Sequence, residues 1–177
     1  METPRALVAY ASRHGSTAEI AHWVADGLRT AGLDTDVAPA RQVCSIDDYD
    51  VVVLGGALYM GRWHRDARRF ARRHQRALRT RAVWLFSSGP LDRSAELRHI
   101  PAVRGVAAIG RRLGARGHRT FGGRLATDVD GPLARAMARR LAGDYRNPEA
   151  VRDWTHEIVG ELPERTFGPV EGRSVPG

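Results

Sequence analysis

Ala6-Leu7-Val8-Ala9-Tyr10-Ala11-Ser12-Arg13-His14-Gly15-Ser16-Thr17 sets the architecture of the N-terminal part of the chain. An apolar run typical of a buried strand changes here into a short loop with small hydroxyl residues, and a helical pattern begins directly afterwards. The free N–H groups and the dipole at a helix N-terminus favour a bound anion. The stretch therefore predicts a strand–loop–helix unit whose loop holds a phosphate group.

Strand-like and helix-like segments alternate along the rest of the chain. The expected strands cover residues 5–11, 35–38, 49–54, 81–86 and 118–122. The expected helices cover residues 16–31, 64–79, 101–113, 131–142 and 147–162. Such alternation predicts an α/β fold with a parallel sheet covered on both faces. Ser16 and Glu19 have the spacing of a capping box, and Pro101 is expected to open its helix.

Three loops follow the carboxyl ends of expected strands, at residues 12–17, 55–63 and 87–92. Ligands bind at this edge of open parallel sheets, where the strand order reverses. If the first, third and fourth strands are neighbours, the three loops converge on one rim.

Length and composition fit one globular domain. The chain has 177 residues, of which 42% are hydrophobic and 27% charged, which is ordinary for such a domain. We expect a single domain over residues 1–163 and a frayed tail over residues 164–177, which is rich in Gly, Pro and Ser. Neither a membrane-spanning run nor a signal-peptide pattern is seen, and the single Cys44 forms no internal disulfide. These features predict a cytoplasmic protein.

The first loop resembles the flavodoxin phosphate loop, a hydroxyl residue followed by x-x-Gly-x-Thr that holds the FMN 5′-phosphate. The other two loops resemble those that enclose the isoalloxazine ring. Within the flavodoxin superfamily the chain is most similar to the menaquinone-dependent protoporphyrinogen oxidase group. The residues that carry this similarity are Ser12-Arg13 before His14-Gly15, then Tyr59-Met60-Gly61-Arg62-Trp63-His64, and Gly143-Asp144 leading to Asp153-Trp154.

The resemblance implies a flavodoxin-like, doubly wound, five-stranded parallel sheet of order 2-1-3-4-5 with helices on both faces. It also implies FMN as cofactor and an oxidoreductase that passes reducing equivalents through FMN to a quinone-type acceptor, as in heme biosynthesis. A flavodoxin-type electron carrier without its own substrate is the alternative. A flavin-free interaction module is a third possibility, because a fold alone does not select a function.

Three groups of residues are expected to hold FMN. Around the phosphate they are Ser12, Arg13, His14, Gly15, Ser16 and Thr17. Around the ring they are Ala57, Leu58, Tyr59, Met60 and Gly61 on one side and Ser87, Ser88, Gly89 and Pro90 on the other. The hydroxyls of Ser12, Ser16 and Thr17 and the backbone N–H groups of the first loop are the expected phosphate donors.

The individual roles within these groups differ. Arg13 either contacts the phosphate or points to solvent, and His14 contributes its backbone. Tyr59 is expected to stack on the flavin, while Trp63 either stacks or packs under the following helix. The third loop is expected to offer backbone N–H groups to the flavin N5, O4 and pyrimidine edge. No side chain is given a catalytic role, because the flavin carries the chemistry. No metal site is expected, because the histidines never occur at His-x-x-x-His spacing.

Arginines crowd residues 62–81, where Asp66 is the only carboxylate, and the net charge of the chain is +8. These arginines form either a solvated helix face or a surface for an anionic partner. Candidate partners are a membrane surface contacting Arg65, Arg68, Arg69, Arg72 and Arg76, the carboxylates of a porphyrinogen, or an acidic redox protein. Nucleic acid is not expected, because aromatic residues are not interleaved with the arginines. A homodimer remains open.

Overall fold

A sheet of five parallel strands forms the centre of the computed structural model, which describes residues 3–13, 15–89, 99–125 and 143–162. The strands are β1 (Arg5–Ala11), β2 (Asp34–Pro39), β3 (Val51–Tyr59), β5 (Ala82–Ser88) and β6 (Gly117–Phe121). Their spatial order is β2-β1-β3-β5-β6. This confirms the predicted order 2-1-3-4-5, since β5 and β6 are the fourth and fifth parallel strands along the chain.

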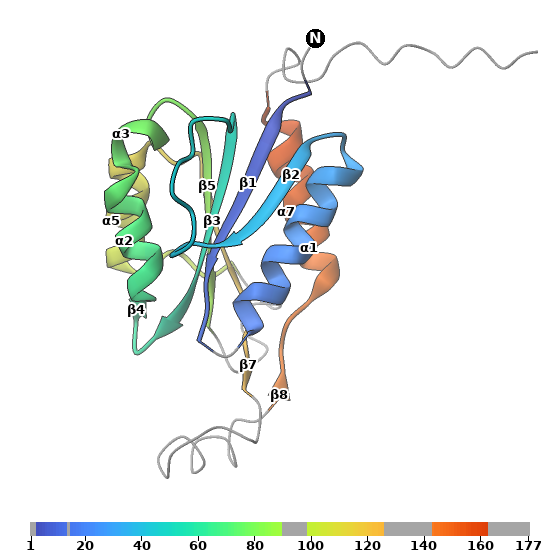
Figure 1. Ribbon diagram of the computed structural model, residues 1–177. Coiled ribbons are helices and arrows are strands. Elements are labelled where there is room, and N and C mark those ends of the chain that lie inside the picture. Colours follow the sequence, from blue (N-terminus) through green and yellow to red (C-terminus); the bar gives the residue numbers. More distant parts are fainter. Residues whose placement is uncertain (1–2, 14, 90–98, 126–142, 163–177) are drawn as a thin grey trace, which may run out of the picture.

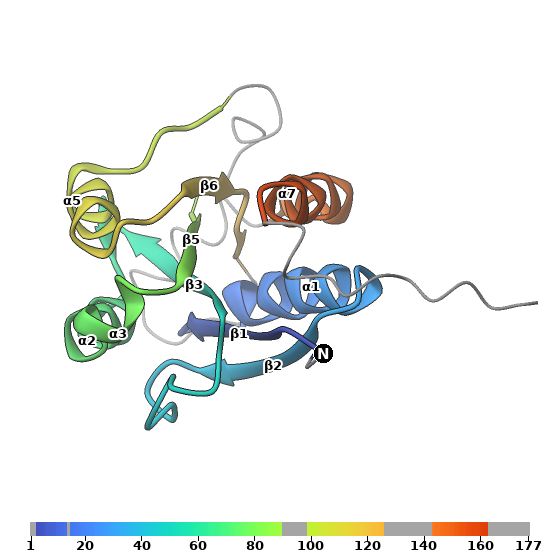
Figure 2. The same cartoon turned by 90° about the horizontal axis from the view of Figure 1, so that it is seen from above.

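Helices cover both faces of this sheet (Figures 1 and 2). One face carries α1 (Ser16–Thr30) and α7 (Pro148–Gly160), and the other carries α2 (Arg65–Arg73), α3 (Gln75–Leu78) and α5 (Arg104–Leu113). A separate antiparallel pair joins β7 (Arg124–Leu125) to β8 (Gly143–Asp144). Among the described residues, no helix has the length and apolar composition needed to cross a bilayer.

Alternating side chains of the central strands feed two separate cores. In β1, Ala6 and Val8 pack with Val24 and other residues of α1, whereas Leu7 and Ala9 pack on the α2 side. A strand of this sheet is therefore apolar on both of its faces where helices cover both faces. This explains the unbroken valines of β3, Val51 to Val53, all of which are buried.

The prediction of a loop throughout residues 55–63 is wrong, because β3 continues to Tyr59 and then forms a hairpin with β4 (Arg62–Trp63). Gly55 and Gly56 lie inside the strand. A Cβ on Gly55 would stand 2.0 Å from Cζ of Phe86, and one on Gly56 would stand 2.5 Å from Nε1 of Trp63. The two glycines thus make room for aromatic rings and do not mark a turn.

The end of the fourth parallel strand, β5, was also predicted too early. Ser87 and Ser88 are the last residues of β5 and are buried, so they do not belong to the loop that follows it. They pair in register with β3 on one side and β6 on the other. Two polar residues at the end of an apolar run resemble a loop start in the sequence, yet the neighbouring strands continue the ladder past them.

Three helix starts or lengths differ from prediction. Gly15 caps α1 with a left-handed backbone (φ 82°), so Ser16 is its first helical residue and the predicted capping box does not form. The expected helix at 64–79 is divided at His74 into α2 and α3. Extended Val103 (φ −59°, ψ 151°) precedes α5, which therefore starts after Pro101. The predicted helix at 131–142 and the tail at 164–177 lie outside the described residues.

Replacing Gly55 by alanine is expected to destabilise the protein, because the added methyl group overlaps the ring of Phe86. Overpacking of this kind costs about 1–3 kcal/mol of unfolding free energy, measured by urea denaturation. Gly105→Ala in α5 is the matched control, since a Cβ there meets nothing within 4 Å and alanine favours helix. Equal stability of Gly55→Ala and the wild type would contradict this packing.

Candidate functional site

The three predicted loops meet at the carboxyl edge of the sheet, as expected. Ala11, the last residue of β1, pairs with Gly56 of β3. Ala57, one residue further, pairs with Ser88 of β5. In Figure 1 this edge lies at the bottom, where α1 begins. The chain segments after β1, β3 and β5 therefore start side by side, as a ligand site at this edge requires.

The loop after β1 is closed by a hydrogen bond from the backbone N–H of Gly15 to Oγ of Ser12, 3.0 Å long. Gly15 has positive φ and a Cβ there would meet nothing within 4 Å, so the space beside its backbone is open. The backbone N–H of Glu19 donates to the carbonyl of Gly15 at 3.1 Å and begins the helical ladder. The first-turn N–H groups of an α-helix have no acceptor within the helix, so this turn is suited to an anion.

Thr17 places a buried hydroxyl in this turn. Its side chain is 1% exposed, and Oγ1 has no hydrogen-bond partner among the described residues. A buried hydroxyl that lacks a partner costs about 1–3 kcal/mol, a cost that a water molecule, an ion or a ligand can remove. A phosphate in this loop would give Thr17 an acceptor. Arg13 is exposed, which leaves its side chain free to face an anion, and His14 lies outside the described residues.

Arg146 holds the first turn of α1 in place, a role that the sequence did not indicate. Its guanidinium pairs with Glu19 of that turn and donates from Nε to Asp144 at 2.7 Å. It also lies over the ring of Trp23, 5.3 Å from the centroid. The Asp144 hydrogen bond, followed by that of Glu19, raises the pKa of Arg146. The side chain is almost fully buried. Its guanidinium links Asp144 of β8 to Glu19 of α1.

The β3–β4 hairpin forms the second part of the site. Tyr59 pairs with Arg62, and the two residues between them, Met60 (φ 48°) and Gly61 (φ 72°), both have positive φ. This is the geometry of a two-residue type I′ turn. Burial raises the pKa of the Tyr59 hydroxyl, while the charge of Arg13 acts in the opposite direction. The charge of Arg13 thus lies within electrostatic range of Tyr59.

Trp63 packs under α2 and is not available for stacking on a ligand. The ring is 3% exposed and belongs to the core on the α2 side. Its Nε1 donates to the carbonyl of Gly56 at 2.9 Å. Tyr59 remains 43% exposed at the carboxyl edge. Of the two aromatic candidates, Tyr59 is the one placed to face a ring, while Ala57 and Leu58 are more buried and support it.

The third part of the site is tightly packed. Gly89 donates from its backbone N–H to the carbonyl of Phe121 at 3.2 Å. A Cβ on Gly89 would lie 2.9 Å from Cβ of Leu58, so glycine permits β5 and the hairpin to approach closely. Pro90 lies outside the described residues. Gly89 is the residue of this loop that the structure describes beyond the end of β5. The contacts expected between this loop and the flavin ring remain a prediction.

A polar pair of buried Ser87 and half-buried His118 lies behind this third part. Oγ of Ser87 and Nε2 of His118 on β6 are 2.9 Å apart. Thr120, in register with Ser87, has a buried Oγ1 without a hydrogen-bond partner. Burial, together with the charge of His99, lowers the pKa of His118 to about 4. His118 is therefore neutral at physiological pH, and Ser87 is held by an uncharged imidazole. The sequence analysis did not find this pair, because its members lie on different strands.

The described residues contain no group of three or more His, Cys, Asp or Glu side chains able to hold a metal ion. What the edge of the sheet offers is an anion-binding turn, an exposed aromatic ring and closely packed backbone. This arrangement suits a ligand with a phosphate at one end and a flat ring at the other.

Loss of His118 is expected to weaken the pH dependence of stability. The unfolded chain takes up a proton near the ordinary histidine pKa of 6.5, whereas folded His118 resists it down to about pH 4. The unfolding free energy is therefore greatest above pH 6.5 and falls as the pH drops towards 4. His118→Gln should show a smaller fall in urea denaturation over this window, with His156→Gln, an exposed position, as control. Parallel curves for His118→Gln and the wild type would exclude a neutral buried imidazole.

Comparison with known proteins places this geometry in a family. The flavodoxin domain family matches residues 7–145, which include all three parts of the site. Protoporphyrinogen IX dehydrogenase (quinone) of Escherichia coli strain K12 is 28% identical over 96 residues, which are 53% of this chain and 53% of that protein. The chain thus spans about half the length of the curated relatives it matches.

Solved structures agree on the fold. Flavodoxin 1 of Bacillus cereus has a TM-score of 0.61 at 17% identity, with 90% of this chain and 99% of that chain covered. A flavodoxin of Streptococcus pneumoniae TIGR4 has a TM-score of 0.58 at 22% identity, with 89% and 99% covered. A flavo di-iron protein variant of Thermotoga maritima has a TM-score of 0.62 at 13% identity, with 92% and 36% covered. The chain belongs to the flavodoxin domain family and is accordingly a flavodoxin-like redox protein that binds FMN.

Proposed function

We propose that FMN lies along the carboxyl edge of the sheet, with its phosphate in the turn at residues 12–17 and its ring beside Tyr59. The observation that carries this proposal is the buried Oγ1 of Thr17, which has no hydrogen-bond partner in the part of the chain that the structure describes. Ser12 already accepts the N–H of Gly15, so its hydroxyl proton remains available to donate to a phosphate oxygen. When bound, FMN supplies the hydride and electron transfer.

The residues of this chain would bind and orient the cofactor and leave the redox chemistry to it. Tyr59 covers one face of the ring, where stacking contributes about 0.5–1.5 kcal/mol beyond area burial. Gly89 follows β5, and its lack of a side chain allows the backbone there to lie close to Leu58 of β3. Neutral His118 holds Ser87 and adds no charge behind the site.

We infer that the reaction is the oxidation of a porphyrinogen-type substrate, with a quinone as the electron acceptor. The support is the Escherichia coli relative whose name states this activity, matched over 96 residues. Cys44 is the only cysteine of the chain and is exposed, which suits the reducing cytoplasm as the place of action. A flavodoxin-type electron carrier is the second candidate, favoured by the coverage of whole flavodoxin chains in the structural matches.

Thr17→Val is expected to weaken FMN binding by about tenfold or more, because a hydrogen bond to a charged group contributes about 1.5–3 kcal/mol. The apoprotein should be as stable as wild type or more so, since valine removes an unsatisfied buried hydroxyl. Thr35→Val is the control: Thr35 is equally buried but lies on β2, and its hydroxyl bonds the carbonyl of Leu33. FMN titration by fluorescence and urea denaturation measure the two effects. Unchanged FMN affinity in Thr17→Val would place the phosphate elsewhere.

The FMN-loaded protein is expected to oxidise protoporphyrinogen in the absence of oxygen when a menaquinone analogue is supplied. The rate should exceed that of free FMN at the same concentration and should depend on the quinone. Porphyrin fluorescence measures the product. An anaerobic rate no higher than that of free FMN would exclude the oxidase. Stepwise reduction then tests the carrier, which should accumulate a one-electron-reduced form, whereas the oxidase should take up electron pairs.

A further inference from the structure

The face of the sheet that carries α2, α3 and α5 is strongly basic. The exposed arginines of these helices, named here the arginine face, are Arg65, Arg68, Arg69, Arg72, Arg73, Arg76, Arg104, Arg111 and Arg112. The one carboxylate on the three helices is Asp66, which pairs with Arg65 at 3.6 Å. α5 contributes Arg104, Arg111 and Arg112 in addition to the arginines of residues 62–81. The positive charge therefore extends from α2 and α3 to α5.

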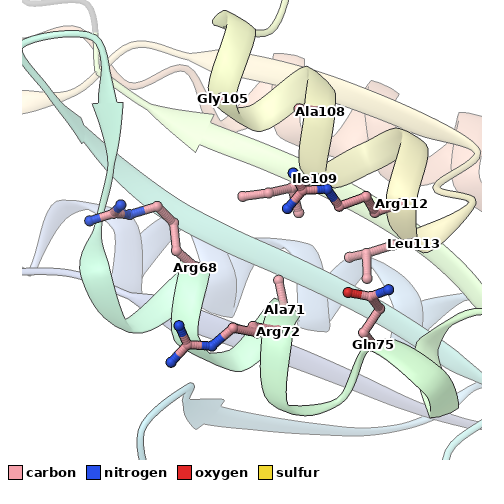
Figure 3. A pocket seen from close by; sticks show the side chains of 9 residues that line it. All are labelled: Arg68, Ala71, Arg72, Gln75, Gly105, Ala108, Ile109, Arg112 and Leu113. Atoms are coloured by element: carbon pink, nitrogen blue, oxygen red, sulfur yellow. The ribbon is translucent and has the colours of Figure 1, made fainter.

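A groove of about 360 Å³ runs between α2 and α5 across this face (Figure 3). Its apolar lining includes Ala71, Ile109 and Leu113, while Arg68 and Arg112 contribute guanidinium groups from opposite helices. An apolar floor with cationic groups at its sides suits an amphipathic anion whose charged head binds arginine. Phospholipids with anionic head groups have this chemistry.

The tip of the β3–β4 hairpin, which also borders the site, is a second feature. Met60 is fully exposed, and it is the only residue other than glycine with positive φ in the described part of the chain. Asn or Gly normally occupies this position of a type I′ turn at little cost. A strained position persists where function needs it. Here the strain presents an unbranched apolar side chain to the outside.

The tip and the arginine face lie on the same side of the molecule. Trp63, which follows the tip in β4, packs in the core under α2, and α2 begins two residues later. Tyr59 and Met60 are the exposed large apolar residues of the described chain. Next to them, exposed Arg62 and Arg65 continue into the arginine face. Apolar tips flanked by arginines are typical of surfaces that lie on a membrane.

We propose that the arginine face and the Met60 tip dock on an anionic lipid bilayer. The head-group phosphates bind along the groove between α2 and α5, and Met60 enters the boundary with the acyl chains. An acidic protein would satisfy the arginines but gives no reason for a strained, exposed methionine. A nucleic acid would favour exposed aromatic rings among the arginines, and Phe70, the aromatic residue of α2, is buried.

This orientation brings the carboxyl edge of the sheet close to the lipid surface, since Tyr59 is adjacent to Met60. The proposal does not rest on the redox reaction, because charge and apolar exposure alone bring the protein to the bilayer. Binding can therefore be measured with the apoprotein as well as with the FMN-loaded protein.

The test is co-sedimentation of the full chain with phosphatidylcholine vesicles that do or do not contain phosphatidylglycerol. We expect binding only to the anionic vesicles, and we expect salt to weaken it. Arg112→Gln should lower the affinity about fivefold, and Arg72→Gln combined with it should lower it further. Arg152→Gln is the matched control, an exposed arginine on α7 at the opposite face, and it should leave the affinity within about twofold.

Met60→Asn separates membrane insertion from attraction by charge. It should weaken vesicle binding, while the unfolding free energy stays equal or rises because asparagine tolerates positive φ. Equal losses for Arg112→Gln and Arg152→Gln would overturn the proposal, because net charge and not this face would then be responsible. Binding to uncharged vesicles as tight as to anionic ones would overturn it too. Tighter binding to duplex DNA or to an acidic protein, with no effect of Met60→Asn, would assign the face to that partner instead.

Discussion

Two neighbouring glycines in β3 allow aromatic rings to lie directly on both sides of the sheet, and the remaining structure follows from this packing. Phe86 occupies the space beside Gly55 in the core shared with α1 and α7. Trp63 occupies the space beside Gly56 in the core shared with α2 and α5. Because side chains alternate along a strand, adjacent glycines serve opposite faces. The sheet is thus fixed on both sides at one level, immediately before its carboxyl edge.

The site depends on this level of packing. Phe86 also contacts Phe121 and Trp154 edge-on, at centroid distances of 6.1 and 6.2 Å. These contacts connect β5, β6 and α7 just below the loops. Trp63 in turn anchors the hairpin through its bond to the carbonyl of Gly56. A rigid base therefore carries the short segments that meet the ligand, which is how binding loops achieve defined geometry.

Periodicity in the sequence was sufficient for the α/β class, the helix faces and the strand–loop–helix turn, whereas the strand order came from the resemblance to flavodoxins. Alternating apolar segments leave few ways to build a parallel sheet, and the hydroxyl residues before a helix mark the turn. In residues 64–79 the buried side chains are Ala67, Phe70, Ala71, His74 and Leu78, while Ala77 is half-buried. These features depend on local spacing, which a single sequence contains.

Long-range contacts account for what the sequence did not reveal. Gly55 and Gly56 resemble a turn unless the rings that press on them are known. The pairing of Arg146 with Glu19 joins residues 127 positions apart. Ser87 of β5 contacts His118 of the neighbouring strand β6. Gly122 is another case, since a Cβ there would lie 1.9 Å from the carbonyl oxygen of Tyr145. Local patterns carry no record of such partners, so only the folded chain identifies them.

The pairing of Arg146 with Glu19 has a consequence for ionic ligands at the neighbouring turn. A carboxylate in the first turn of a helix would repel an incoming dianion, yet here it is paired with a guanidinium that it shares with Asp144 and that stays protonated over the whole physiological range. The helix dipole and the backbone amides favour an anion at the same turn. An incoming phosphate group would therefore meet an ion pair beside the turn and not an isolated carboxylate.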